Sequence, residues 1–146
     1  MLNILLIEDS EDDAFLFESA LNREGLGSRV CRVENGVQAI SYLEGEGDYH
    51  NRSTFPFPTV IFSDIKMPVM DGFAILKWLK THPRCSVLPV MMFSSSSEQA
   101  DIEKAYRLGA NAYLVKPMSL DELQKSVQIA HEFWKRCSKI ALASAL

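Results

Sequence analysis

Five short apolar runs alternate with amphipathic segments along this chain, and that alternation predicts the architecture. The runs suit buried strands, which are expected at residues 2–7, 29–33, 60–62, 88–93 and 112–115. Apolar residues then recur at helical spacing, so helices are expected at residues 11–24 (with Gly25 near the stop), 36–43, 73–80, 99–108 and from 120 onward. Five strand–helix alternations predict an α/β fold with a doubly wound, five-stranded parallel sheet. The flavodoxin-like strand order 2-1-3-4-5 suits this number of strands.

Polar residues mark the starts of several expected helices. Ser10, with Asp13 three residues later, resembles a capping box. Asp13 could be a further metal ligand, but its place in the first helical turn makes it mainly a capping acid. Asp71 is interpreted as a structural residue at the start of the third helix, and Ser119 begins a full capping box. The helical spacing predicts apolar faces that include Phe15, Leu16, Val37, Ile40, Leu43, Ile75, Leu76, Leu79, Leu123, Val127, Ala130 and Trp134.

Length and composition narrow the class of protein. The 146 residues are most simply one domain, and the formal net charge of −4 gives no basic surface for nucleic acid. The three cysteines are widely spaced without a C-x-x-C motif, which argues against a disulfide framework or a zinc site. No signal peptide is recognisable, and no apolar stretch approaches the roughly 20 residues of a membrane span. We therefore expect a cytoplasmic protein that contacts neither nucleic acid nor membrane.

Charged and hydroxyl residues follow the expected strands, and the carboxyl ends of parallel strands meet at one edge of a sheet. Three carboxylates that crowd together there repel one another unless one is protonated or a cation is present, and a hard cation such as Mg²⁺ suits oxygen ligands. A lysine and a hydroxyl beside them would stabilise a transferring phosphoryl group, and a carboxylate between metal and lysine can act as its nucleophile. The residues expected at this edge are Glu8, Asp9, Asp64, Ser94 and Lys116.

Four segments of the chain together resemble response-regulator receiver domains of two-component signalling, including the single-domain type. They read I-L-L-I-E-D-S, V-I-F-S-D-I-K-M-P-V-M-D-G, P-V-M-M-F-S-S and A-Y-L-V-K-P, and the resemblance spans roughly residues 2–134. It implies the receiver variant of the flavodoxin-like fold. It also implies a phosphoacceptor at Asp64, a Mg²⁺ site formed by Asp9, Asp64 and the Lys66 backbone carbonyl, a phosphate-binding Lys116, a switch pair Ser94 and Tyr113, and lifetime-tuning positions Lys66 and Ser96.

Further expectations depend on this resemblance and on where the chain departs from it. Glu8 replaces the commoner Asp, so its longer arm is expected to reach the metal through water. Ser94 stands where Thr is usual, and the peptide before Pro117 is expected to be cis. We expect a receiver domain over residues 1–136 and a frayed tail or helix extension over 137–146, with no room for a DNA-binding output domain.

The resemblance also suggests partners. The long 44–58 loop and the Glu132-Phe133-Trp134 ending resemble stand-alone receivers that partner bacterial phytochrome-type histidine kinases. A homodimer through the fourth helix, fifth strand and fifth helix is a hypothesis based on their aromatic residues, Tyr106, Tyr113, Phe133 and Trp134. Beyond self-phosphorylation and slow autodephosphorylation, no substrate turnover is expected.

Two other functions remain open from the sequence. An aspartate-nucleophile phosphohydrolase also uses a strand-end Asp and Mg²⁺, but it normally has a second acid two residues later, where this chain has Lys66. A non-phosphorylated docking module with a vestigial site is the other. A dinucleotide-binding fold is disfavoured, because the first strand–helix turn is acidic and lacks glycine. The three histidines, His50, His82 and His131, are scattered and are not expected to be catalytic.

Overall fold

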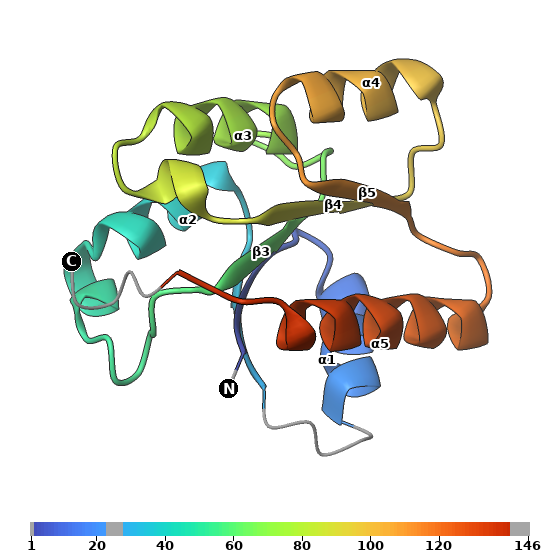
Figure 1. Ribbon diagram of the computed structural model, residues 1–146, viewed down its shortest axis with the longest axis horizontal. Helices are drawn as coiled ribbons and strands as arrows, with labels where there is room; N and C mark the ends of the chain where they lie inside the picture. Colours follow the sequence, from blue (N-terminus) through green and yellow to red (C-terminus); the bar gives the residue numbers. More distant parts are fainter. Residues whose placement is uncertain (1, 23–27, 141–146) are drawn as a thin grey trace.

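The computed structural model describes residues 2–22 and 28–140, and it confirms the predicted sheet (Figure 1). The five strands are parallel in the order β2-β1-β3-β4-β5 and span Asn3–Ile7 (β1), Arg29–Val33 (β2), Val60–Ser63 (β3), Val90–Ser94 (β4) and Ala112–Val115 (β5). The helices that alternate with them span Glu11–Asn22 (α1), Gly36–Glu44 (α2), Gly72–Thr81 (α3), Gln99–Arg107 (α4) and Leu120–Arg136 (α5), with two 3-10 turns at Gly47–His50 (η1) and Cys85–Val87 (η2).

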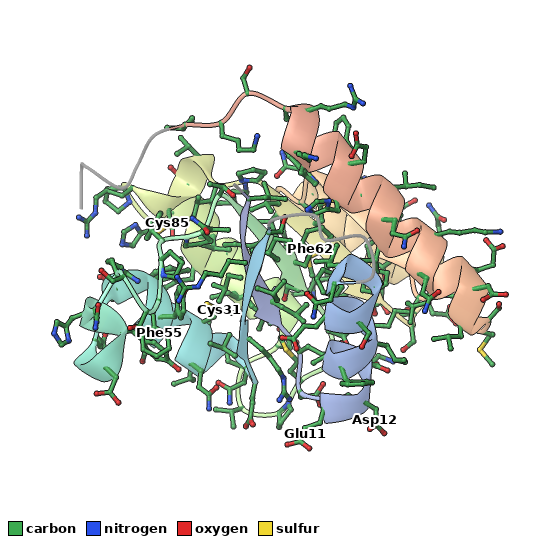
Figure 2. All side chains as sticks on the ribbon, turned by 90° about the horizontal axis from the view of Figure 1, so that it is seen from below. Glu11, Asp12, Cys31, Phe55, Phe62 and Cys85 are labelled. Atoms are coloured by element: carbon green, nitrogen blue, oxygen red, sulfur yellow. The ribbon has the colours of Figure 1, made fainter. Side chains whose placement is uncertain are left out.

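Helices cover both faces of the sheet, with α1 and α5 on one side and α2, α3 and α4 on the other (Figure 1). Successive strand residues point to opposite faces. Ile4 and Leu6 therefore pack in the core beneath α1 and α5, while Leu5 and Ile7 pack beneath α2 and α3. Phe62 lies on the α1 side, where its ring is 5.0 Å from that of Phe17 (Figure 2). Both faces of the central strands are thus apolar, which leaves the strand ends as the place for polar chemistry.

Most helix starts and faces agree with the sequence patterns, but the inward face of α1 differs. The Asp71 carboxylate accepts a hydrogen bond from the Ala74 N–H, and the Ser119 hydroxyl accepts one from the Glu122 N–H, as N-caps. Phe15, expected to face inward, is 68% exposed. Helix α1 instead buries Ala14, Phe17, Ala20 and Leu21, because Phe17 is the aromatic residue that meets Phe62 and Phe93.

Three other expectations on the helices have different outcomes. Val37 is half exposed, since α2 buries Ala39, Tyr42 and Leu43 against the sheet. Helix α5 ends at Arg136, and the expected stop of α1 near Gly25 lies outside the described residues. Within the described part of the chain, no helix is long and apolar enough to cross a membrane.

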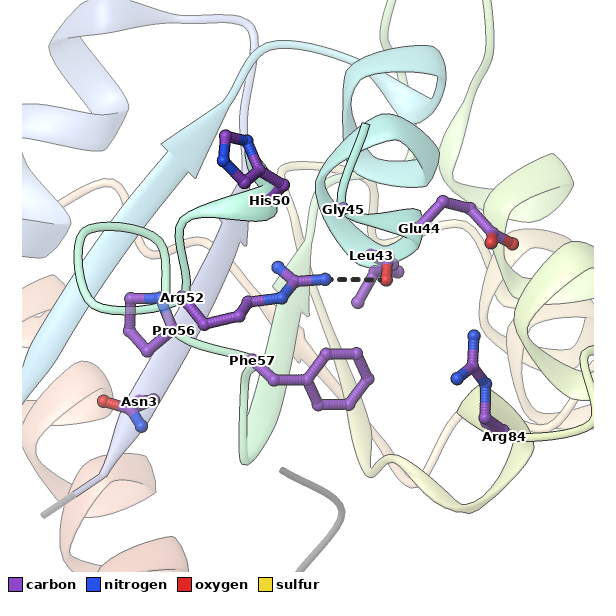
Figure 3. A pocket seen from close by; sticks show the side chains of 9 residues that line it. All are labelled: Asn3, Leu43, Glu44, Gly45, His50, Arg52, Pro56, Phe57 and Arg84. Carbon is purple, nitrogen blue, oxygen red and sulfur yellow. Dashed lines mark hydrogen bonds between the residues drawn. The ribbon is translucent and has the colours of Figure 1, made fainter. Parts of the chain in front are cut away.

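The amino end of the sheet carries the long segment between α2 and β3, which is organised around one cation. The Arg52 guanidinium donates hydrogen bonds to the carbonyls of Tyr42 (2.9 Å), Leu43 (3.0 Å) and Phe55 (3.3 Å). It also lies over the rings of Tyr42 and Phe57. Figure 3 shows this guanidinium reaching the Leu43 carbonyl at the edge of a hollow of about 320 Å³. Arg52 therefore occupies the last carbonyls of α2, where a positive charge is favourable.

Candidate functional site: an acidic pocket bridged by a lysine

The carboxyl ends of β1 and β3 bring the predicted acids together. These strands are neighbours, and Ile7 pairs with Ser63, so Glu8 and Asp64 leave the sheet side by side. The Asp64 N–H still donates to the Ile7 carbonyl at 3.0 Å, which continues the ladder to the site itself. Carboxylate oxygens of Glu8, Asp9 and Asp64 lie within 4.8 Å of one another. Glu8 and Asp64 are buried and Asp9 is exposed, so the cluster opens to solvent on the Asp9 side.

Arg32 on β2 fixes the backbone of this acidic turn, a role that sequence reasoning missed. Its Nε donates to the Glu8 carbonyl at 2.9 Å, and its guanidinium Nη2 donates to the Asp9 carbonyl at 3.2 Å. The Glu8 N–H in turn donates to the carbonyl of Val33, next to Arg32 on the same strand. The available signal was the second arginine of a short strand, one residue before the strand ends at the level of the acids. Arg32 orients the acids through their backbone and leaves their carboxylates available.

Lys116, at the carboxyl end of β5, reaches across the pocket and bridges three carboxylates. Its Nζ lies 2.5 Å from Glu8 Oε1, 2.8 Å from Asp13 Oδ2 and 3.1 Å from Asp64 Oδ2. Burial by itself would lower the pKa of Lys116, but the hydrogen-bonded carboxylates of Asp13 and Glu8 raise that pKa above its ordinary value. The amine is therefore a fixed positive charge, and the contact between Lys116 and Asp64 across the pocket agrees with the prediction from the strand ends.

Burial also shifts the pKa of Glu8, and it raises this pKa where it would lower that of Lys116. Loss of water raises the pKa of Glu8 to about 7, although Lys116 beside it favours the charged form and opposes the rise. The nearby charge of Asp64 pushes the pKa of Glu8 further upward. One amine thus only partly compensates the acids at this edge, so the pocket has room for more positive charge.

Asp13 corrects the sequence interpretation, because its carboxylate is part of the pocket and does not serve as a capping acid. Half of the predicted capping box is present: the Asp13 N–H donates to Ser10 Oγ at 3.2 Å. The Ser10 N–H, however, donates to Glu8 Oε2 at 3.2 Å, so the reciprocal bond is taken by a different acid. With that partner occupied, the Asp13 carboxylate turns to Lys116.

The expected switch residues form a chain of hydrogen bonds after β4. Ser94 is buried, and its hydroxyl accepts from the Ser96 N–H at 3.2 Å. The Ser96 carbonyl accepts from the Tyr113 hydroxyl at 2.8 Å, and Ser96 Oγ donates to Asp101 Oδ2 at 2.6 Å. Ser96 therefore joins the hydroxyl near the pocket to the aromatic residue on β5.

Two expectations on the surrounding loops have clear outcomes. The side chain of Lys66 is exposed, two residues beyond Asp64. The expected cis peptide before Pro117 is wrong, since no cis peptide occurs in residues 2–22 and 28–140. The trans isomer is the one that X–Pro bonds intrinsically favour, by about 0.5–1 kcal/mol. In this arrangement the Lys116 N–H donates to the Ser94 carbonyl at 2.7 Å, which ties the lysine to β4.

The donor set fits a hard divalent cation. Carboxylate oxygens are the ligands that Mg²⁺ and Mn²⁺ accept, and two of the three acids are buried close together, where repulsion is strongest. Asp9 and Asp64 would hold such an ion directly, with Glu8 beside them. No cysteine or histidine belongs to this cluster of acids.

This parallel sheet, with buried acids at its central strands and a lysine reaching them from its edge strand, defines a flavodoxin-like domain of the receiver class. Residues 4–128 match the response regulator receiver domain, and the chain belongs to that family.

Individual relatives extend the match over nearly the whole chain. The response regulator Rcp1 of Synechocystis sp. is 32% identical over 131 residues, which is 90% of this chain and 87% of Rcp1. The crystal structure of the phosphorylated cyanobacterial phytochrome response regulator RcpA superposes with a TM-score of 0.88 at 31% identity, covering 96% of this chain and 99% of RcpA. The Mn²⁺-bound form of Rcp1 gives a TM-score of 0.87 at 30% identity, covering 97% of this chain and all of that one.

Proposed function

We propose that this chain is a stand-alone response regulator that accepts a phosphoryl group on Asp64 from a sensor histidine kinase. The observation that carries the proposal is the position of Lys116, whose amine contacts Asp64 while two further carboxylates hold it in place. A buried carboxylate next to a fixed amine and two additional acids is suited to receive an anionic group once a cation completes the charge balance.

The chemistry is a transfer between two nucleophiles. A carboxylate oxygen of Asp64 attacks the phosphorus of the kinase phosphohistidine; a P–O bond forms, the P–N bond breaks, and its electron pair returns to the imidazole nitrogen. Lys116 stabilises the charge on the equatorial oxygens of the moving group, and Ser94 offers a hydroxyl from the neighbouring strand. We assign a Mg²⁺ site to Asp9, Asp64 and the Lys66 carbonyl, with Glu8 through water, and an ion held there would supply positive charge for the transfer.

The acyl phosphate would then bias two conformations of the segment after β4. The Ser94 hydroxyl accepts from the Ser96 N–H in the present structure, and a bond from Ser94 to a phosphoryl oxygen would draw this segment toward the pocket. Ser96 is bonded to Tyr113, so the movement would release the aromatic side chain. A full shift of a two-state equilibrium needs about 5.5 kcal/mol, and new charge-assisted hydrogen bonds contribute roughly 1.5–3 kcal/mol each.

The relatives and the exposed surface suggest the partners. Several solved relatives are phytochrome response regulators by name, which supports a phytochrome-type kinase as the phosphodonor. We place the action of the chain in the cytoplasm together with that donor. We assign residues 1–136 to the receiver domain and 137–146 to a tail. A homodimer through α4, β5 and α5 is supported by apolar side chains exposed on these elements, among them Tyr106, Val115, Ile129 and Phe133.

Mass spectrometry of the intact protein after treatment with acetyl phosphate and Mg²⁺ tests the assignment. We expect one labile phosphoryl adduct on the wild type, none on Asp64→Asn, and an undiminished adduct on Asp48→Asn, a matched change in an exposed acid on η1. Transfer from an autophosphorylated bacterial phytochrome kinase would extend the result to the natural donor class. An adduct that persists on Asp64→Asn would refute the phosphoacceptor assignment.

A further inference from the structure

Asp13 is the carboxylate in the pocket that neither the metal nor the phosphoryl group needs. It comes from α1, whereas Glu8 and Asp64 follow strands of the sheet. Its side chain is 43% exposed, and its ligand atoms are not part of the group of acids that could share a cation. Nevertheless it lies 2.8 Å from Lys116 Nζ, closer than Asp64 at 3.1 Å. A capping function does not explain this direction, because the Ser10 N–H is bonded to Glu8.

The three contacts of Lys116 have different fates during the proposed reaction. An ammonium group has three N–H donors, and here each has a carboxylate acceptor. Asp64 would become an acyl phosphate, and Glu8 would turn toward a cation. Asp13 would be the partner of the lysine that does not change. A free lysine side chain loses rotamer entropy when it is fixed, so a constant partner keeps the amine in place before the phosphoryl group arrives.

We infer that Asp13 is a positioning residue for phosphoryl transfer, which holds the Lys116 amine in contact with Asp64. This inference rests on the proposed function of Asp64. Asp13 and Lys116 also line a cavity of about 260 Å³ next to segment 117–120, so the outer side of their contact lies in a hollow of the surface. Asp13 acts through Lys116 and touches no reacting atom itself.

Whether Asp13 variants are phosphorylated more slowly or faster than wild type distinguishes a positioning role of Asp13 from a purely electrostatic one. Removing a negative charge near the pocket would, by electrostatics alone, favour the approach of an anionic phosphodonor and accelerate the reaction. Loss of positioning has the opposite effect. We therefore expect Asp13→Ala to slow phosphorylation of Asp64 by acetyl phosphate roughly tenfold, and Asp13→Asn, which keeps an acceptor oxygen, roughly threefold. Asp13→Glu, which keeps the charge, should restore part of the rate.

The rates are measured by intact-protein mass spectrometry at fixed Mg²⁺, with folding checked by circular dichroism. Asp12→Asn is the matched control, since Asp12 is the adjacent exposed acid of the same helical turn and has the same charge. We expect its rate to stay within about twofold of the wild type. In a Lys116→Met background, Asp13→Ala should have no further effect, because the two residues act as one unit.

The outcomes are distinguishable. Rates of Asp13→Ala equal to or faster than those of Asp12→Asn would overturn the inference while leaving Asp64 as the phosphoacceptor. A full additional loss in the Lys116→Met background would also overturn it, because Asp13 would then act by another route. A wild-type protein that forms no adduct at all would refute the proposed function and, with it, this inference.

Discussion

Charged side chains are packed into the protein at both ends of the sheet, but only at the amino end are they fully compensated by their neighbours. At the amino end, the Arg52 cation meets three backbone carbonyls and two aromatic rings. At the carboxyl end, Lys116 faces three carboxylates, with Asp9 beside them. The first arrangement stabilises a loop, whereas the second leaves an excess of negative charge that a cation can compensate. In this molecule, buried charge therefore indicates a candidate functional site only at the carboxyl end of the sheet, where its compensation is incomplete.

Removing Lys116 should give the largest change in stability, because it leaves more negative charge uncompensated at the carboxyl end of the sheet. We expect Lys116→Met to lower the free energy of unfolding of the metal-free protein by about 3 kcal/mol at pH 7, since three carboxylates lose a partner with a buried side chain. Urea denaturation measures the loss. Added Mg²⁺ should narrow the gap between variant and wild type, because the more negative pocket binds the cation more tightly.

The pH dependence of this variant has a definite sign. Burial raises the pKa of Glu8 to about 7 in the folded protein, and the loss of Lys116, which favours the charged form, would raise that pKa further. A carboxyl group with a raised folded-state pKa contributes stability that is complete at low pH and is lost as pH rises through that pKa. The part of the gap between Lys116→Met and wild type that comes from Glu8 should therefore narrow as pH falls from above 7 toward 5. A difference in stability that widens over this pH range would contradict the conclusion that uncompensated carboxylates cause the loss.

Removing Arg52 tests the balanced end of the sheet. Arg52→Ala should lower the free energy of unfolding by about 2 kcal/mol, because the last carbonyls of α2 lose their donors and two rings lose a packed neighbour. Urea denaturation with and without Mg²⁺ should give the same loss, in contrast to Lys116→Met. Arg84→Ala, an exposed arginine on the same hollow, is the control and should change stability by less than about 0.5 kcal/mol.

The contrast between the two ends also explains what the sequence could predict. Topology alone brings Glu8, Asp64 and Lys116 together, because the carboxyl ends of parallel strands meet whatever the details of packing. Asp13 depended on a local competition for the Ser10 N–H, which a spacing pattern does not resolve.

The remaining differences have a similar origin. Arg32 is visible in the sequence as a charged residue within β2, but its acceptors are backbone carbonyls, which no side-chain pattern identifies. The prediction that Phe15 faces the core was wrong, because α1 has a second aromatic residue two positions later. Phe17 occupies the site beside Phe62, and Phe15 is exposed. Positions set by strand order were therefore predictable, while those set by competition between neighbouring groups were not.

Differences in backbone conformation between the two ends of the sheet give the smallest expected changes in the free energy of unfolding. Left-handed conformations at the amino end fall on Gly45 (φ +69°) and Gly47 (φ +58°), where they are unstrained. In the loop between β3 and α3 at the carboxyl end, the same conformation falls on Val69 (φ +70°), which is β-branched and 84% exposed, so little burial offsets its strain.

Val69→Gly should therefore raise the free energy of unfolding by about 0.5–1 kcal/mol, because relief of the left-handed strain exceeds the backbone entropy that glycine adds to the unfolded chain. Gly47→Ala is the matched change at the amino end and should lower it by about 1 kcal/mol, since alanine there must adopt the strained conformation while its Cβ meets no atom within 4 Å. Urea denaturation of the two variants against wild type compares them directly. A loss of stability in Val69→Gly would mean that the exposed valine makes stabilising contacts and that the strain does not lie at this residue. The expected gain would instead identify backbone strain at Val69, in the loop that follows Asp64.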